Sequence, residues 1–135
     1  MKKILIIPAL LIVAVVNAQW IQNSSCDKKA NIVANQAIEY MANLEYLPAL
    51  GAANSALLLD ENCGCAKLTL AAISSQNPKW GSRIQKLDEI DSSKLTPEEK
   101  AWYDYLRIVD NVKRSNFQIT LQNKFSKSPL INYLG

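Results

Sequence analysis

The chain has 135 residues, a formal net charge of +3 and 49% hydrophobic residues, which is typical of one globular domain. It contains no histidine, the residue that most often serves as general base, metal ligand and activator of Ser or Cys nucleophiles. We therefore expect a protein that is not an enzyme and that holds neither a metal ion nor a cofactor.

The first 18 residues have the pattern of a signal peptide. Two lysines precede an apolar run from Ile4 to Val16, and Val16-Asn17-Ala18 places small residues where a signal peptidase cleaves. The run has 13 residues, whereas a membrane span needs about 20. We predict cleavage before Gln19, no stable membrane anchor afterwards, and export to the periplasm or the medium.

The two lysines leave with the signal peptide, so the mature chain carries 13 basic and 12 acidic residues. No block of basic residues remains that would attract phosphate groups. We therefore expect no nucleic-acid partner. Residues 19–135 are expected to form a single domain.

Apolar residues recur at steps of three and four along the mature chain, which predicts an all-α fold. Ser24 or Ser25 is expected to cap the first helix. Thr96-Pro97-Glu98-Glu99 is the clearest helix start, with a cap, a proline in the first turn and a capping box. The expected helices span residues 27–44, 48–59, 64–74, 78–91, 97–109 and 112–125, and a last helical turn begins at Ser128-Pro129.

Residues 30–63 carry small side chains at Ala37, Ala49 and Ala56, an aromatic at Tyr40, and the ending Ala56-Leu57-Leu58-Leu59-Asp60. This pattern resembles a degenerate tetratricopeptide repeat, a 34-residue helix–turn–helix unit. Departures from the family pattern are Val33, Gln36, Ala53 and Glu61, which stand where tryptophan, leucine, a large residue and proline are usual. A second unit would begin near Gly64. The resemblance implies antiparallel helical hairpins, arranged as a short solenoid or a compact bundle.

Members of this family bind proteins or peptides along the face formed by the first helices of their repeats. Asn31 and Asn35 lie one turn apart there and could bond a peptide backbone. We therefore expect a non-catalytic interaction module with a protein or peptide partner. A truncated remnant of a longer repeat protein is an alternative, because about two repeats make a short solenoid. Carried over by position, the binding face comprises Asn31, Ala34, Asn35, Ile38 and Met41.

The chain has three cysteines, Cys26, Cys63 and Cys65. A helical hairpin brings the start of its first helix close to the end of its second, so we expect a disulfide of Cys26 with Cys63 or Cys65 in an exported protein. Such a bridge would stabilise the fold by about 4 kcal/mol. The pair Cys63 and Cys65 also supports a second hypothesis, a thiol-active exported protein.

Overall fold

The computed structural model describes residues 19–134, where the regular elements are seven α-helices and three short 3₁₀ turns. The all-α class predicted from the sequence is confirmed. The predicted signal peptide, residues 1–18, lies outside the described residues. Among these helices, none combines the length and the apolar character needed to span a bilayer. In chain order they are α2 (Lys28–Ala42), α3 (Tyr46–Leu59), α4 (Gly64–Ile73), α5 (Arg83–Asp88), α6 (Pro97–Arg107), α7 (Asn111–Lys124) and α8 (Pro129–Tyr133).

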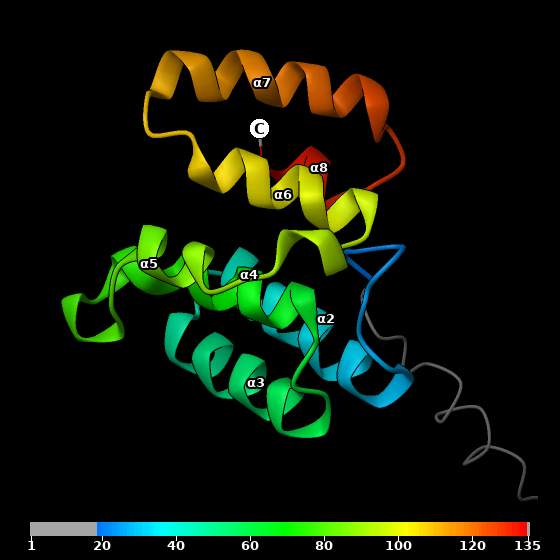
Figure 1. Cartoon of the computed structure of the whole chain (residues 1–135), viewed down its shortest axis with the longest axis vertical. Coiled ribbons are helices and arrows are strands. Elements are labelled where there is room, and N and C mark those ends of the chain that lie inside the picture. The colour runs from blue at the N-terminus through cyan, green and yellow to red at the C-terminus, as the bar shows by residue number, and fades with distance from the viewer. Residues whose placement is uncertain (1–18, 135) are drawn as a thin grey trace, which may run out of the picture.

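The helices stack from α3 at the bottom of Figure 1, through α2 and α4, to α6 and then α7 at the top. Buried alanines line the contacts between α2, α3 and α4. Their small side chains let the helix backbones approach closely. Trp102 of α6 is the largest fully buried side chain. The alanines of the three lower helices that are completely buried are Ala30, Ala34, Ala37, Ala49, Ala53, Ala56, Ala66 and Ala71.

The N-terminus of α6 forms as its sequence predicts. The Thr96 hydroxyl accepts a hydrogen bond from the Glu99 N–H at 3.2 Å, and Glu99 Oε1 accepts one from the Thr96 N–H at 3.0 Å. Pro97 is the first helical residue, where its missing N–H costs nothing. The first helix differs from expectation, because Asp27 caps α2 and accepts from the Ala30 N–H, whereas Ser24 and Ser25 lie outside it.

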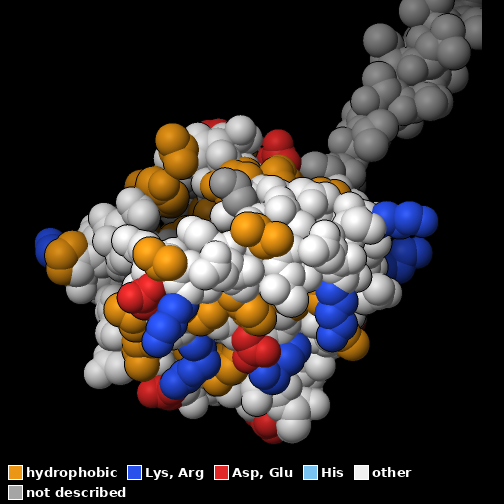
Figure 2. Space-filling model, turned by 90° about the horizontal axis from the view of Figure 1, so that it is seen from above, with side chains coloured by type: hydrophobic (Ala, Val, Ile, Leu, Met, Phe, Trp, Pro, Cys, Tyr) orange, Lys and Arg blue, Asp and Glu red, His pale blue; other side chains and the backbone are white. Residues whose placement is uncertain are grey.

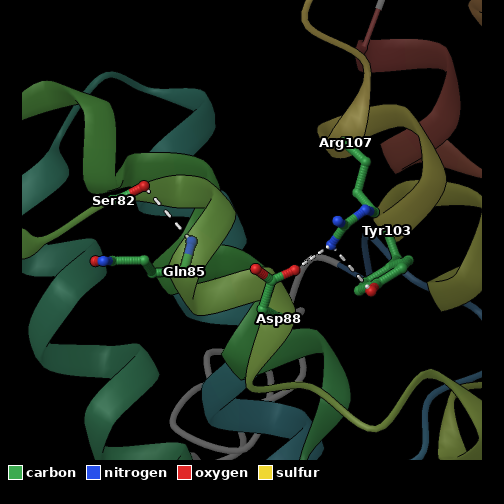
Figure 3. Close-up of polar contacts among 5 residues, drawn as sticks. All are labelled: Ser82, Gln85, Asp88, Tyr103 and Arg107. Carbon is green, nitrogen blue, oxygen red and sulfur yellow. Dashed lines mark hydrogen bonds and ion pairs between the residues drawn. The ribbon is translucent and has the colours of Figure 1, made fainter.

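The helix expected over residues 78–91 is interrupted. A 3₁₀ turn covers Pro78–Trp80, and Gly81 then adopts φ of 91°, a left-handed conformation that ends the turn. Only Arg83–Asp88 is α-helical. Arg107 connects this short helix to α6, since its guanidinium donates to Asp88 at 2.8 Å and to the Tyr103 hydroxyl at 3.2 Å (Figure 3).

Residues 20–27, which we call the N-terminal strap, cross the molecule without regular structure and join helices that are distant in sequence. The Trp20 and Ile21 N–H groups donate to Asn35 Oδ1 at 2.7 and 3.1 Å. The N–H groups of Gln22 and Asn23 both donate to Glu98 Oε1 at 2.9 Å. The strap therefore covers part of α2 and fastens it to α6.

The described residues form a hairpin of α2 and α3, but a tetratricopeptide arrangement is not confirmed. The second hairpin expected from Gly64 onward does not have the repeat's length, because α4 is followed by two 3₁₀ turns and the six-residue α5. Helix α6 then packs on α4, and α7 and α8 pack on α6 (Figure 1). The result is a compact helical bundle.

Leu44, in the turn between α2 and α3, has φ of 63°, which favours glycine. The Glu45 N–H closes this turn on the Tyr40 carbonyl at 2.8 Å, as in a Schellman motif. Because the Leu44 side chain is 67% exposed, we expect Leu44→Gly to raise the free energy of unfolding by about 1 kcal/mol in urea denaturation. Leu44→Ala is the control, and an equal gain there would show that backbone strain is not the cause.

Candidate functional site

The binding face predicted from the repeat resemblance is not an open surface. Asn31 is partly exposed, whereas the other four predicted residues are between 0 and 7% exposed. The N-terminal strap covers Asn35, whose Oδ1 accepts two of the strap's backbone N–H groups, whereas Ala34, Ile38 and Met41 belong to the hydrophobic core. The prediction of an accessible face at Asn31, Ala34, Asn35, Ile38 and Met41 is corrected accordingly.

The three cysteines meet where the strap reaches the turn between α3 and α4. Cys26 and Cys63 form a disulfide, one of the two pairings that the sequence left open. Cys65, in the first turn of α4, is a buried free thiol whose Sγ lies 3.2 Å from that of Cys26 and 3.9 Å from that of Cys63. All three sulfurs therefore belong to one cluster.

Burial raises the pKa of the Cys65 thiol from 9.0 to about 12, and the Glu99 carboxylate adds to the rise, whereas a contact with the Ser24 hydroxyl opposes it. The thiol is therefore protonated at neutral pH and shielded from solvent. Reactive thiols have lowered pKa values and accessible sulfurs, so this arrangement does not favour the thiol-active alternative.

We expect Cys65 in the folded, disulfide-bonded chain to be alkylated about a thousandfold more slowly at pH 8 than in urea, because the folded thiol has a pKa of about 12 instead of 9.0. The folded chain holds the Cys65 proton more tightly than the unfolded chain does. This contribution to the free energy of unfolding is therefore complete below pH 9 and is lost as pH rises toward 12. Mass spectrometry after timed alkylation measures the rates. Similar rates in both states would contradict the burial of Cys65.

An open cleft of about 490 Å³ lies between the strap, the start of α6 and the turn before α8. One buried carboxylate, Glu98, lines this cleft. Its Oε1 accepts hydrogen bonds from two strap N–H groups, and its Oε2 accepts one from the Ser128 hydroxyl. Lys124 and Lys127 also line the cleft and are exposed. These hydrogen bonds connect Glu98 to the strap and to the turn before α8.

Helix α3 exposes apolar side chains over its outer face, at the bottom of Figure 1. Leu47, Leu58 and Leu59 are 70, 88 and 50% exposed, and none of the 14 residues of this helix is charged. A helix that is apolar on all sides is normally buried on all sides. The absence of charge between residues 46 and 59 was the sequence signal that could have identified this surface.

The opposite end of the molecule has a different character. Figure 2 looks onto the end of the molecule that carries α7, and on this face charged side chains of both signs are interspersed with separate apolar ones. Val112 and Ile119 of α7 are exposed, but Lys113 and Lys124 lie on the same helix. Mixed surfaces of this kind are ordinary for a soluble domain.

Comparison with known proteins finds no matching family model, no matching curated protein and no matching solved structure. Two features of this all-α bundle stand out: the outer face of α3 and the three-cysteine cluster.

Proposed function

We propose that this chain is a non-catalytic protein-interaction module whose contact surface is the outer face of α3. The observation that carries the proposal is an uncharged helix that turns Leu47, Leu58 and Leu59 to solvent. Exposed apolar surface of this kind is a mark of protein–protein contacts. The engagement of Glu98 in hydrogen bonds and the burial of Cys65 support a role without catalysis.

The occupant of this face is a second copy of the chain, paired antiparallel through α3. All exposed positions of α3 except Asn54 are symmetric about Ala53, because position 47 matches 59, position 48 matches 58, and position 51 matches 55. A twofold axis at this level places Leu47 of one copy against Leu59 of the other, and Gly51 against Ser55. Self-complementary faces of this type form isologous dimers, and the helix itself, Tyr46–Leu59, carries no charge that would repel its counterpart.

Gly51 supports this pairing, because a Cβ added to it would meet nothing within 4 Å. The fold of the single chain therefore does not require glycine at position 51. The lack of a side chain there lets a second helix approach closely. A 14-residue helix is about 21 Å long, so one helix pair lies at the small end of stable interfaces. We expect a weak dimer, with a Kd of roughly 10⁻⁶ to 10⁻³ M.

Sedimentation equilibrium of the disulfide-bonded chain tests the proposal. A concentration-dependent dimer is expected, together with its loss in Gly51→Gln, which places bulk at the centre of the face without disturbing the fold. Leu58→Glu should have the same effect, because it would bury a charge at each end of the pair. Ile119→Glu on α7 is the matched control and should dimerise as the native chain does.

A native chain that stays monomeric up to millimolar concentration would overturn the self-pairing. A dimer that persists unchanged in both Gly51→Gln and Leu58→Glu would show that another surface mediates association. Circular dichroism of each variant verifies that the helices remain folded.

We further propose that the chain works after export, in an oxidising compartment. The signal-peptide pattern of residues 1–18 and the Cys26–Cys63 disulfide support this location. N-terminal sequencing of the chain recovered from producing cells should give Gln19 as the first residue. Recovery of a full-length chain with reduced thiols in the cytoplasm would contradict it.

A further inference from the structure

Three sulfur ligands lie within reach of a single ion at the junction of the strap and α4. The Sγ atoms of Cys26, Cys63 and Cys65 all lie within 4.8 Å of one another. In a tetrahedral thiolate site with metal–sulfur bonds of about 2.3 Å, the sulfurs are about 3.8 Å apart. Cys63 and Cys65 are already 3.9 Å apart, and Cys26 is free to take a similar spacing when its bond to Cys63 is open.

We propose that the chain, while its three cysteines are reduced, binds one soft divalent cation of the Zn²⁺ class through Cys26, Cys63 and Cys65. Thiolates are the ligands that such ions prefer. The newly synthesised chain has these thiols before any disulfide forms, so the site needs no reductant to arise. This inference is independent of the α3 surface and goes beyond the proposed interaction function.

The local structure holds the three ligands for one ion. Gly64 separates Cys63 and Cys65, and a Cβ on it would lie 2.7 Å from Ser25 Oγ and 2.9 Å from Glu99 Oε2. This crowding fixes the two cysteines against the strap, which carries Cys26. It also places the Glu99 carboxylate beside the cluster, and its negative charge favours a cation there.

The site has one open side. Cys63 and Cys65 are fully buried, whereas Cys26 is partly exposed. An ion that enters on the Cys26 side meets three sulfurs and retains one position for water, which gives the four-coordinate geometry that Zn²⁺ adopts. Each bound thiol releases its proton to solvent when the ion binds.

Metal and disulfide are mutually exclusive, because both use the sulfurs of Cys26 and Cys63. Either one connects the strap to the turn between α3 and α4. The ion is therefore a cross-link for the reduced chain. A disulfide oxidant takes two electrons from the Cys26 and Cys63 thiolates and is itself reduced to two thiolates, and the Cys26–Cys63 bond that forms expels the ion. The oxidised chain keeps only the buried Cys65 thiol and binds no ion.

The test is titration with Cd²⁺, a Zn²⁺ analogue whose bonds to thiolates absorb in the ultraviolet. The full chain is reduced with a phosphine, which is oxidised to phosphine oxide with oxygen taken from water, and the excess is removed without air. We expect one Cd²⁺ per chain, with the thiolate-to-cadmium absorption and a higher melting temperature followed by circular dichroism. The disulfide-bonded chain in the same titration should bind none.

The variant Cys65→Ser distinguishes binding of Cd²⁺ by three sulfurs from binding by the Cys26 and Cys63 thiols alone. We expect its reduced form to bind Cd²⁺ at least 100-fold more weakly than the reduced native chain. Equal affinity in the two would overturn the proposal. Binding by the reduced native chain without any gain in helicity or melting temperature would also overturn it, because the ion would then be held by an unfolded chain.

Discussion

Removal of the Cys26–Cys63 bridge is expected to lower the free energy of unfolding by about 4 kcal/mol. The two cysteines are 37 residues apart in sequence, and a disulfide across a loop of this length restricts the unfolded chain by about that amount. Domains of this size are stable by about 5–15 kcal/mol, so the loss is a large part of the total. Urea denaturation of the two forms measures the difference.

The comparison needs a variant that cannot form a substitute bridge, because Cys65 lies 3.2 Å from Cys26 and 3.9 Å from Cys63. The double variant Cys26→Ser with Cys65→Ser leaves only Cys63. The single variant Cys65→Ser retains the native bridge and is the control, since it shares the burial cost of the new hydroxyl. A difference below about 1 kcal/mol between them would show that the unfolded chain is not restricted by the bridge.

Helix positions could be predicted from the sequence wherever a local signal specifies them. The capping box of Thr96 and Glu99, with Pro97 between them, depends only on residues within one turn, and α6 begins there. The steps of three and four in α2 reflect burial of one helix side, which any bundle provides. The helix expected over residues 78–91 was shortened by Gly81, whose left-handed backbone ends the 3₁₀ turn before it.

The candidate surfaces could not be predicted in this way. The strap shows no periodicity, and its hydrogen bonds join residues such as Asn23 and Glu98, which are 75 positions apart. No local pattern carries that information, so the face around Asn35 was expected to be open although the strap covers it. The symmetric α3 face depends on which side of the helix α2 and α4 leave exposed, which only the packing decides.

The disulfide is an intermediate case. The hairpin topology brought Cys26 close to both Cys63 and Cys65, and the sequence therefore reduced the pairing to two choices. Cys63 precedes α4 and Cys65 lies in its first turn, so both reach the strap. The observed pairing leaves the buried Cys65 thiol free. The same proximity makes a three-sulfur site available in the reduced chain.

Glu99→Ala is expected to lower the free energy of unfolding by about 3 kcal/mol. Glu99 is fully buried, its Oε2 accepts from the N–H and hydroxyl of Ser25 at 3.2 and 3.0 Å, and its Oε1 accepts from the Thr96 N–H at 3.0 Å. Hydrogen bonds to a charged group contribute about 1.5–3 kcal/mol each, and buried donors left without a partner add a penalty. Urea denaturation at neutral pH measures the loss.

Glu61→Ala is the matched control, because Glu61 is exposed and such a change should stay within about 0.5 kcal/mol of the native chain. Amide hydrogen exchange locates the damage, since Glu99→Ala should speed the exchange of the Ser25 and Thr96 N–H groups more than that of amides in α3. Loss of stability spread evenly over all helices would contradict a local role. Faster exchange confined to the strap and the start of α6 would show that Glu99 fastens these two segments together, and that the strap depends on this carboxylate as well as on the disulfide.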